Sequence, residues 1–148
     1  MLDRIDIHIE VPAAKYQELS SNLPAESSTQ IKERVNKAGA IQRERFSAAG
    51  GSASCAGGAS ALGRGGKEEG ILCNAQMNHK QIRKFCMLGK EESELLKMAM
   101  SELNFSARAY DKILKVSRTI ADLAGSESIL AEHISEAIQY RSLDRQLW

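Results

Sequence analysis

The sequence predicts a mainly helical chain with a single strand close to its N-terminus. Helix-forming residues (Ala, Leu, Glu, Lys and Arg) dominate the composition. Apolar residues in the second half recur at helical spacing, whereas residues 5–11 alternate as a strand does. The 148 residues are enough for one ordinary domain, or for one small domain joined to a linker.

The strand prediction concerns residues 1–12. Their apolar positions are Ile5, Ile7, Ile9 and Val11. This alternation is typical of a half-buried strand, and Pro12 then ends ladder pairing. No second strong strand pattern follows. We therefore expect an orphan strand whose sheet lies in sequence outside this chain, and a chain that is the C-terminal piece of a longer protein.

Residues 13–47 contain a predicted basic amphipathic helix, which runs from a cap at Ser27 or Ser28 to about Phe46. Its predicted apolar stripe comprises Ile31, Val35, Ala38, Ile41 and Phe46. The rest of its surface carries Lys32, Arg34, Lys37, Arg43 and Arg45. Such charges usually form a solvated face, and a stripe that faces DNA is the alternative.

Residues 48–70 are built from Gly, Ala and Ser with almost no large apolar side chain. Such a segment buries too little apolar surface to offset the conformational entropy that it would lose on ordering, so a flexible loop is predicted. Gly58 and Gly63 have the glycine spacing of a Walker A loop, but Arg64 and Gly65 stand where that motif requires Lys and Ser or Thr. The chain thus lacks Walker A, and it also lacks Walker B.

Residues 71–148 contain four short predicted helices, at about 78–86, 91–103, 106–124 and 130–140. Ser106 is a suitable cap for the third helix and Gly125 a natural stop. The predicted core face of that helix is Tyr110, Ile113, Leu114, Ser117, Ile120, Ala121 and Ala124. Its opposite face holds Arg108, Asp111, Lys112, Lys115 and Asp122, with Arg118 and Thr119 at the margin. Helices this short must pack together as a bundle.

Overall charge excludes little, because the net charge is +1 and argues for neither a nucleic acid nor a membrane partner. No apolar stretch approaches the length of a membrane span. Three cysteines without a CxxC pair fit a reducing cytoplasm. The three histidines are far apart and lack zinc-ligand spacing, so no metal site is predicted.

Four blocks of sequence, in this order, resemble the C-terminal region of magnesium-chelatase-like AAA+ ATPases, with the bacterial ComM-like (YifB-like) branch the most similar. The blocks are 2–12 (LDRIDIHIEVP), 73–77 (CNAQM), 106–111 with 120–123 (SARAYD and IADL), and 132–134 with 136–141 (EHI and EAIQYR). The resemblance implies that residues 1–12 form the last strand of the nucleotide-binding core and that residues 71–148 form its helical lid. The loop at 48–70 departs from the family by being longer.

The resemblance also implies the functional residues. Arg4 matches an arginine finger that acts in trans on the γ-phosphate of a neighbouring subunit, and Asp3 would orient it. Arg108 matches the sensor-2 arginine that contacts the β- and γ-phosphates in cis, and Arg118 is expected to flank the same face. A guanidinium suits this chemistry because it is always charged and binds phosphate bidentately. From the residues alone, a surface Asp-Arg pair and a solvated first-turn arginine are the simpler interpretations.

For the full-length protein the resemblance implies ATP and Mg²⁺ as cofactors. Its implied partners are its own AAA+ core, neighbouring subunits of a homo-oligomeric ring, expected as a hexamer, and DNA, with no membrane. The ComM-like branch suggests a branch-migration helicase. This chain alone should bind no cofactor and hydrolyse no ATP. The alternatives are a magnesium chelatase subunit that acts in tetrapyrrole metal insertion, and a non-enzymatic helical module that binds protein or DNA.

Overall fold

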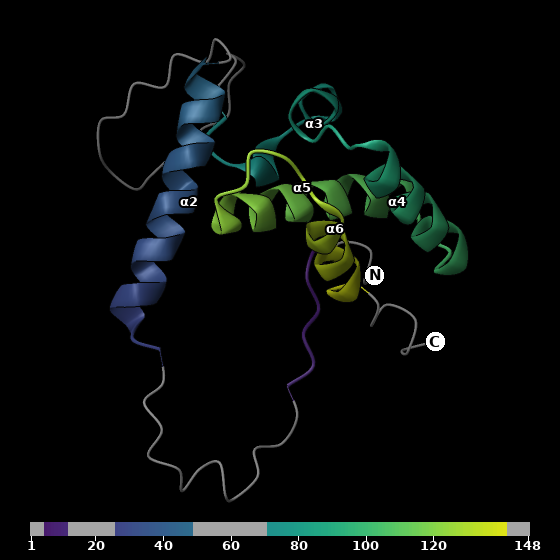
Figure 1. Ribbon diagram of the computed structural model, residues 1–148, viewed down its shortest axis with the longest axis horizontal. Coiled ribbons are helices and arrows are strands. Elements are labelled where there is room, and N and C mark those ends of the chain that lie inside the picture. Colours follow the sequence, from purple (N-terminus) through teal and green to yellow (C-terminus); the bar gives the residue numbers. More distant parts are fainter. Residues whose placement is uncertain (1–4, 12–25, 49–70, 142–148) are drawn as a thin grey trace, which may run out of the picture.

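A computed structural model of the chain describes residues 5–11, 26–48 and 71–141. Its elements are α2 (Ser28–Ala48), the short 3₁₀ helix η2 (Asn74–Gln76), α3 (His79–Phe85), α4 (Lys90–Glu102), α5 (Ala107–Ala124) and α6 (Ala131–Gln139). Figure 1 shows α5 across the centre, with the other helices around it. The mainly helical prediction is confirmed, and the described residues contain no strand. Asp3, Arg4 and the predicted loop lie outside these residues.

The helix ends follow the capping signals in the sequence. Ser106 Oγ accepts a hydrogen bond from the backbone N–H of Ala109 at 3.2 Å, at the start of α5. Gly125 ends the helix with φ of 71°, a left-handed conformation that glycine adopts without a steric cost. Asn78 caps α3 in a reciprocal capping box with Gln81. These local bonds explain why the predicted boundaries agree with the observed helices.

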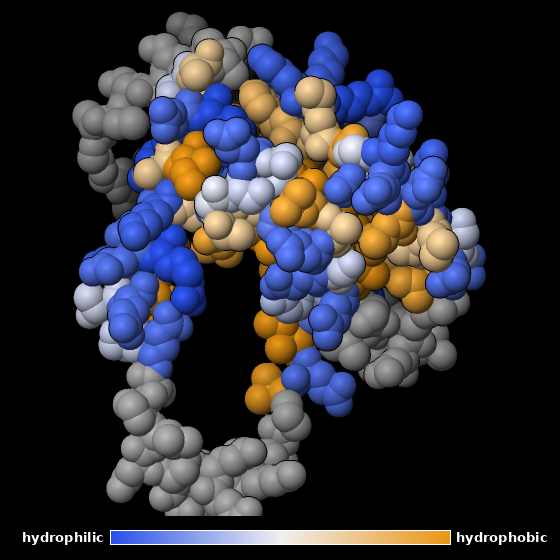
Figure 2. All heavy atoms as spheres, in the orientation of Figure 1, coloured by the Kyte–Doolittle hydropathy of each residue, from blue (hydrophilic) through white to orange (hydrophobic). Residues whose placement is uncertain are grey.

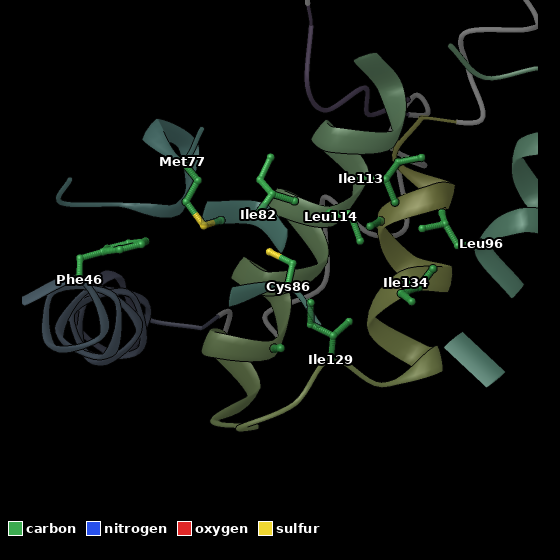
Figure 3. Close-up of a cluster of buried hydrophobic side chains, with 11 residues drawn as sticks. Phe46, Met77, Ile82, Cys86, Leu96, Ile113, Leu114, Ile129 and Ile134 are labelled. Carbon is green, nitrogen blue, oxygen red and sulfur yellow. The ribbon is translucent and has the colours of Figure 1, made fainter. Parts of the chain in front are cut away.

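The core forms around the inward face of α5 (Figure 3). Ile113 and Ile134 are fully buried where α5 meets α6. The other buried apolar members are Phe46, Met77, Ile82, Cys86, Leu96, Leu114, Ala121, Ile129 and Ala137. Tyr110 was expected in this core, but it is 37% exposed because it lies in the first turn of α5, at the edge of the bundle. Ala124, in the last turn, is exposed for the same reason.

The predicted apolar stripe of α2 packs only near its C-terminal end. Ala38 and Phe46 are buried, and the ring of Phe46 meets Phe85 edge-on with 5.4 Å between centroids. Ile31 and Val35 are 41% and 54% exposed. A helix of 21 residues is about 31 Å long, so its first half extends beyond the small bundle (Figure 1). Stripe members in that half consequently have no neighbour among the described residues to bury them.

The described residues contain no partner strand for residues 5–11, so the orphan strand, whose sheet is expected outside this chain, stays a prediction. The segment has no ladder partner, and it lies instead beside the end of α6. The backbone N–H of His8 donates to the carbonyl of Tyr140 at 2.9 Å. Alternation specifies an extended backbone, but a ladder needs a second strand, and these residues meet a helix end. Ile7 and Ile9 remain 46% and 68% exposed.

Within the described residues, none of the helices has the length and apolar character needed to cross a bilayer.

Candidate functional site

Arg108 stands in the first turn of α5 with its side chain exposed to solvent. Its neighbour Ala109 is buried, so the backbone of this turn is fixed against the bundle while the guanidinium points outward. Arg108 makes no hydrogen bond or ion pair with any residue that the structure describes. An uncommitted cation at a helix N-terminus can meet an anion that the helix dipole also favours. The predicted outward orientation of Arg108 is therefore confirmed, and its role stays a prediction.

A groove of about 380 Å³ opens beside this first turn, between α3 and α5. Its polar wall includes His79 and Asp111, whose Nδ1 and Oδ2 atoms are 3.2 Å apart. Its floor is apolar and contains the thiol of Cys86. Burial raises the pKa of Cys86 to about 11, although Arg118 and Arg45 oppose the shift. The thiol is thus neutral at physiological pH and unsuited to act as a nucleophile.

A second groove, also of about 380 Å³, runs along α5 on the side of residues 5–11. Its lining is mainly apolar and comprises Ile7, Ile9, Val116, Ile120 and Leu123 among others. Two lysines of α5 also line it. Lys112 Nζ is 2.7 Å from Asp6 Oδ1, and Lys115 Nζ donates to the carbonyl of Ala75 at 2.9 Å. Both ammonium groups are therefore engaged by the protein itself.

Arg118 occupies a different position from the one predicted. Its side chain is 4% exposed, and all three guanidinium nitrogens donate within the bundle. Nε and Nη2 bond to Asp122 Oδ1 at 3.0 and 2.8 Å, Nη1 to the carbonyl of Glu127 at 2.7 Å, and Nη2 also to that of Ser126 at 2.6 Å. This arginine therefore holds the loop after α5 and does not flank the Arg108 face. The expected placement is corrected because the loop after α5 folds back to supply acceptors for this guanidinium, which periodicity along one helix does not reveal.

Asp122, predicted to be solvated, is the centre of a buried polar cluster. Arg45 of α2 donates to it from Nη1 at 2.9 Å, and Asn74 Nδ2 donates at 2.8 Å. Burial alone would raise the pKa of this carboxyl, but hydrogen bonds from Arg45 and Asn74 and the charge of Arg118 outweigh burial and lower it. Asp122 is thus an ionised buried group that joins α2, η2 and α5.

Sequence reasoning missed this cluster because its members come from three separate segments. Arg45 Nη1 donates to Asn74 Oδ1 at 3.1 Å, and the backbone N–H of Asn74 donates to Gln42 Oε1 at 3.2 Å, so α2 meets η2 through two polar contacts. A buried face on α2 that contains Gln42 does not stand out in a hydropathy pattern. Only the packing of α2 on α5 brings these groups together.

The other predicted site residues, Asp3 and Arg4, lie outside the residues that the structure describes. Among the described residues, no cluster of three or more His, Cys, Asp or Glu side chains could hold a metal ion. The geometry therefore offers one exposed arginine, Arg108, at the start of the central helix of a small bundle.

The described residues thus form a small helical bundle whose central helix carries an exposed arginine in its first turn. Residues 25–141 match the family described as magnesium chelatase, subunit ChlI C-terminal, and the chain belongs to this family. It is 37% identical to the competence protein ComM of Haemophilus influenzae and 35% identical to YifB of Escherichia coli, each over 99% of this chain. It spans 24% of the length of each of these relatives.

Proposed function

We propose that this region is the lid of a magnesium-chelatase-like AAA+ ATPase, in which Arg108 contacts the β- and γ-phosphates of ATP in cis. The contrast between two arginines of α5 carries the proposal. Arg118 is buried and fully engaged, whereas Arg108 is exposed at the helix N-terminus, where backbone N–H groups favour an anion. ATP and Mg²⁺ would be held by the core outside these residues.

Arg4 is proposed as the arginine finger that reaches the γ-phosphate of a neighbouring subunit, with Asp3 orienting it. The support is the resemblance of residues 2–12 to the family segment, together with the chemistry of the guanidinium. A cation fixed against the transferred phosphoryl group is worth about 10³–10⁵ in rate. This assignment requires a homo-oligomeric ring, proposed as a hexamer, in the cytoplasm.

The proposed motor remodels DNA. Lys32, Lys37 and Arg43 are exposed on α2, and the first two lie on the half that extends beyond the bundle. Figure 2 shows this half largely hydrophilic and separated by empty space from the apolar residues at 5–11. A basic helix of this kind can neutralise DNA phosphates. We also take the name of one relative, a competence protein, as support for a DNA substrate.

Metal insertion into a tetrapyrrole is the second candidate, because the family description names magnesium chelatase. The two candidates differ in what binds. For the DNA motor we expect single-stranded DNA to bind the complete protein with an affinity that falls steeply between about 50 and 200 mM salt. Replacing Lys32, Lys37 and Arg43 by Ala should weaken that binding. Porphyrin binding without DNA binding would favour the chelatase candidate.

The test of the lid itself is ATP turnover by the complete ATPase that carries this region. Arg108→Ala should lower turnover by about 100-fold or more, since one lost phosphate contact has that order of effect. Lys97→Ala is the matched control, because Lys97 is exposed on α4 and contributes to neither groove. Turnover in Arg108→Ala that equals the control would remove the sensor assignment.

A further inference from the structure

The outer face of α3 carries only basic charge. Lys80, Arg83 and Lys84 are exposed at positions i, i+3 and i+4, so their side chains share one face of the helix. The seven residues of α3 include no Asp or Glu. Lys80 and Arg83 make no hydrogen bond or ion pair with any residue that the structure describes. These two cations are therefore available to an anion from outside the bundle.

The basic face of α3 continues the exposed cations of α2. Phe46 of α2 packs edge-on against Phe85 of α3, and Lys84 Nζ lies 5.2 Å from the centre of the Phe85 ring. Arg43 is exposed about one turn before Phe46. Figure 1 shows α3 close to the C-terminal end of α2. Cations thus lie on both sides of the contact between the two helices, an arrangement that suits a chain of phosphates.

The groove between α3 and α5 adjoins this face, because Arg83 also lines the groove. Its floor is apolar, and Tyr110, which is 37% exposed, lines it from α5. Asp111 is on the same wall, with its side chain 34% exposed in the pair with His79. A carboxylate there repels phosphates. The groove therefore favours a flat, uncharged group whose attached phosphates stay over α3.

A base of a single strand has these properties. Its faces stack on aromatic rings, and the backbone beside it carries one phosphate for each nucleotide. In a duplex the bases are paired and stacked, so an intact duplex offers no base to such a groove. ATP also combines a base with phosphates, but Arg108, its proposed phosphate contact, does not line this groove. The observations therefore favour DNA over ATP as the occupant.

We infer that the groove between α3 and α5 binds an unpaired base of single-stranded DNA, which stacks on Tyr110. Lys80, Arg83 and Lys84 bind the adjacent phosphates, and the strand continues toward Arg43 on α2. The inference rests on the DNA substrate of the proposed function and deepens it, because it names the site that receives a base.

The first test measures the Kd of a short thymidine oligonucleotide for the complete ATPase by fluorescence anisotropy. Tyr110→Leu removes the ring and should raise the Kd by about 5- to 100-fold, which is the range for one lost stacking contact. Tyr110→Phe keeps the ring and should stay within about twofold of wild type. An unchanged Kd in Tyr110→Leu, or an equal rise in both variants, would overturn the inference.

An abasic strand of the same length separates stacking from charge, because it keeps the phosphates and lacks the bases. Its Kd should change less than about twofold in Tyr110→Leu. Equal losses on the abasic and the thymidine strand would rule out a base in the groove. The Kd of a non-hydrolysable ATP analogue should also stay within about twofold. Loss of that affinity with unchanged DNA binding would assign the groove to ATP and overturn the inference.

The second test concerns the phosphates and uses exposed positions only. Replacing Lys80, Arg83 and Lys84 together by Ala should make the slope of log Kd against log salt less steep by about 2, since each phosphate contact to a single strand contributes about 0.7. Lys97→Ala is the matched control, because Lys97 is exposed on α4 and lines neither groove, and it should leave the slope unchanged. A triple variant with the wild-type slope would contradict the phosphate contacts.

Failure of this site and failure of the proposed function give different results. If replacing Lys32, Lys37 and Arg43 weakens DNA binding while the α3 and Tyr110 variants do not, only the inference is lost. If the complete ATPase binds no single-stranded DNA, the proposed substrate is lost and the inference is lost with it. The lid assignment is judged separately, by ATP turnover in Arg108→Ala.

Discussion

Arg45, near the end of α2, donates from Nη1 to Asp122 Oδ2 across 2.9 Å, and Asp122 is the same carboxylate that Arg118 holds from within α5. One buried anion therefore serves two helices that come from distant parts of the sequence. Phe46, one position after Arg45, packs edge-on against Phe85 of α3, so α2 also has an apolar contact with a second helix. These contacts join α2 to the lid, so we expect the two to move together.

Removing the charge of Asp122 should destabilise the chain strongly. In Asp122→Asn the side chain keeps its size, but two guanidinium groups lose their anionic partner, and breaking a buried pair in this way costs about 3–5 kcal/mol. Urea denaturation followed by circular dichroism measures the free energy of unfolding. Asp111→Asn is the control, because Asp111 is partly exposed in its pair with His79 and should lose about 1 kcal/mol or less. Equal losses in the two variants would contradict the role of Asp122.

The same carboxylate predicts a loss of stability in acid. Its pKa is lowered in the folded protein, whereas in the unfolded chain it stays near the ordinary value of 3.8. The stabilisation is therefore complete above that ordinary value and is lost as the pH falls through the lower, folded value. Urea titrations at a series of pH values should show a steeper acid loss for wild type than for Asp122→Asn. Parallel pH profiles would show that another group causes the loss.

Replacing the two arginines of α5 should change the free energy of unfolding by very different amounts. Arg118→Ala removes donors to Asp122 and to the carbonyls of Glu127 and Ser126, so it should cost about 3–5 kcal/mol. Arg108→Ala, at an exposed position, should change the free energy of unfolding by about 0.5 kcal/mol or less. Thermal or urea unfolding of the isolated chain decides this without any nucleotide. A stable Arg118→Ala variant would refute the structural role of that side chain.

Cys86 should resist alkylation while the chain is folded. The residue is 5% exposed and the pKa of its thiol is raised to about 11, so little thiolate is present at pH 8. Iodoacetamide labelling followed by peptide mass spectrometry should find Cys73, which is partly exposed, modified well before Cys86. The difference should disappear in denaturant. Rapid labelling of Cys86 in the folded chain would contradict its burial.

The helix boundaries could be predicted because their causes are local. Asn78, Ser106 and Gly125 act on backbone groups within a few residues, so the sequence around each one carries the whole signal. The exposure of Arg108 was predictable for a similar reason, because it follows from periodicity along one helix. The pairing of Asp111 with His79 was not predictable, because His79 comes from another helix.

Two features of the chain could not be settled by local sequence, for one physical reason. The strand pattern at residues 5–11 describes one backbone, and whether it forms a ladder depends on a partner strand that the prediction places outside this chain. The apolar stripe of α2 was correct in spacing, yet Ile31 and Val35 are exposed because the bundle is shorter than the helix.

By itself, the sequence determined a helical chain, the ends of its helices and the family to which it belongs, since each of these is recorded in short runs of residues. Only the tertiary structure decided that Asp122 and Arg118 are interior groups and that Lys112 reaches Asp6. Burial and pairing depend on which segment covers which face. That choice is made by groups up to 136 positions apart, and no local pattern encodes it.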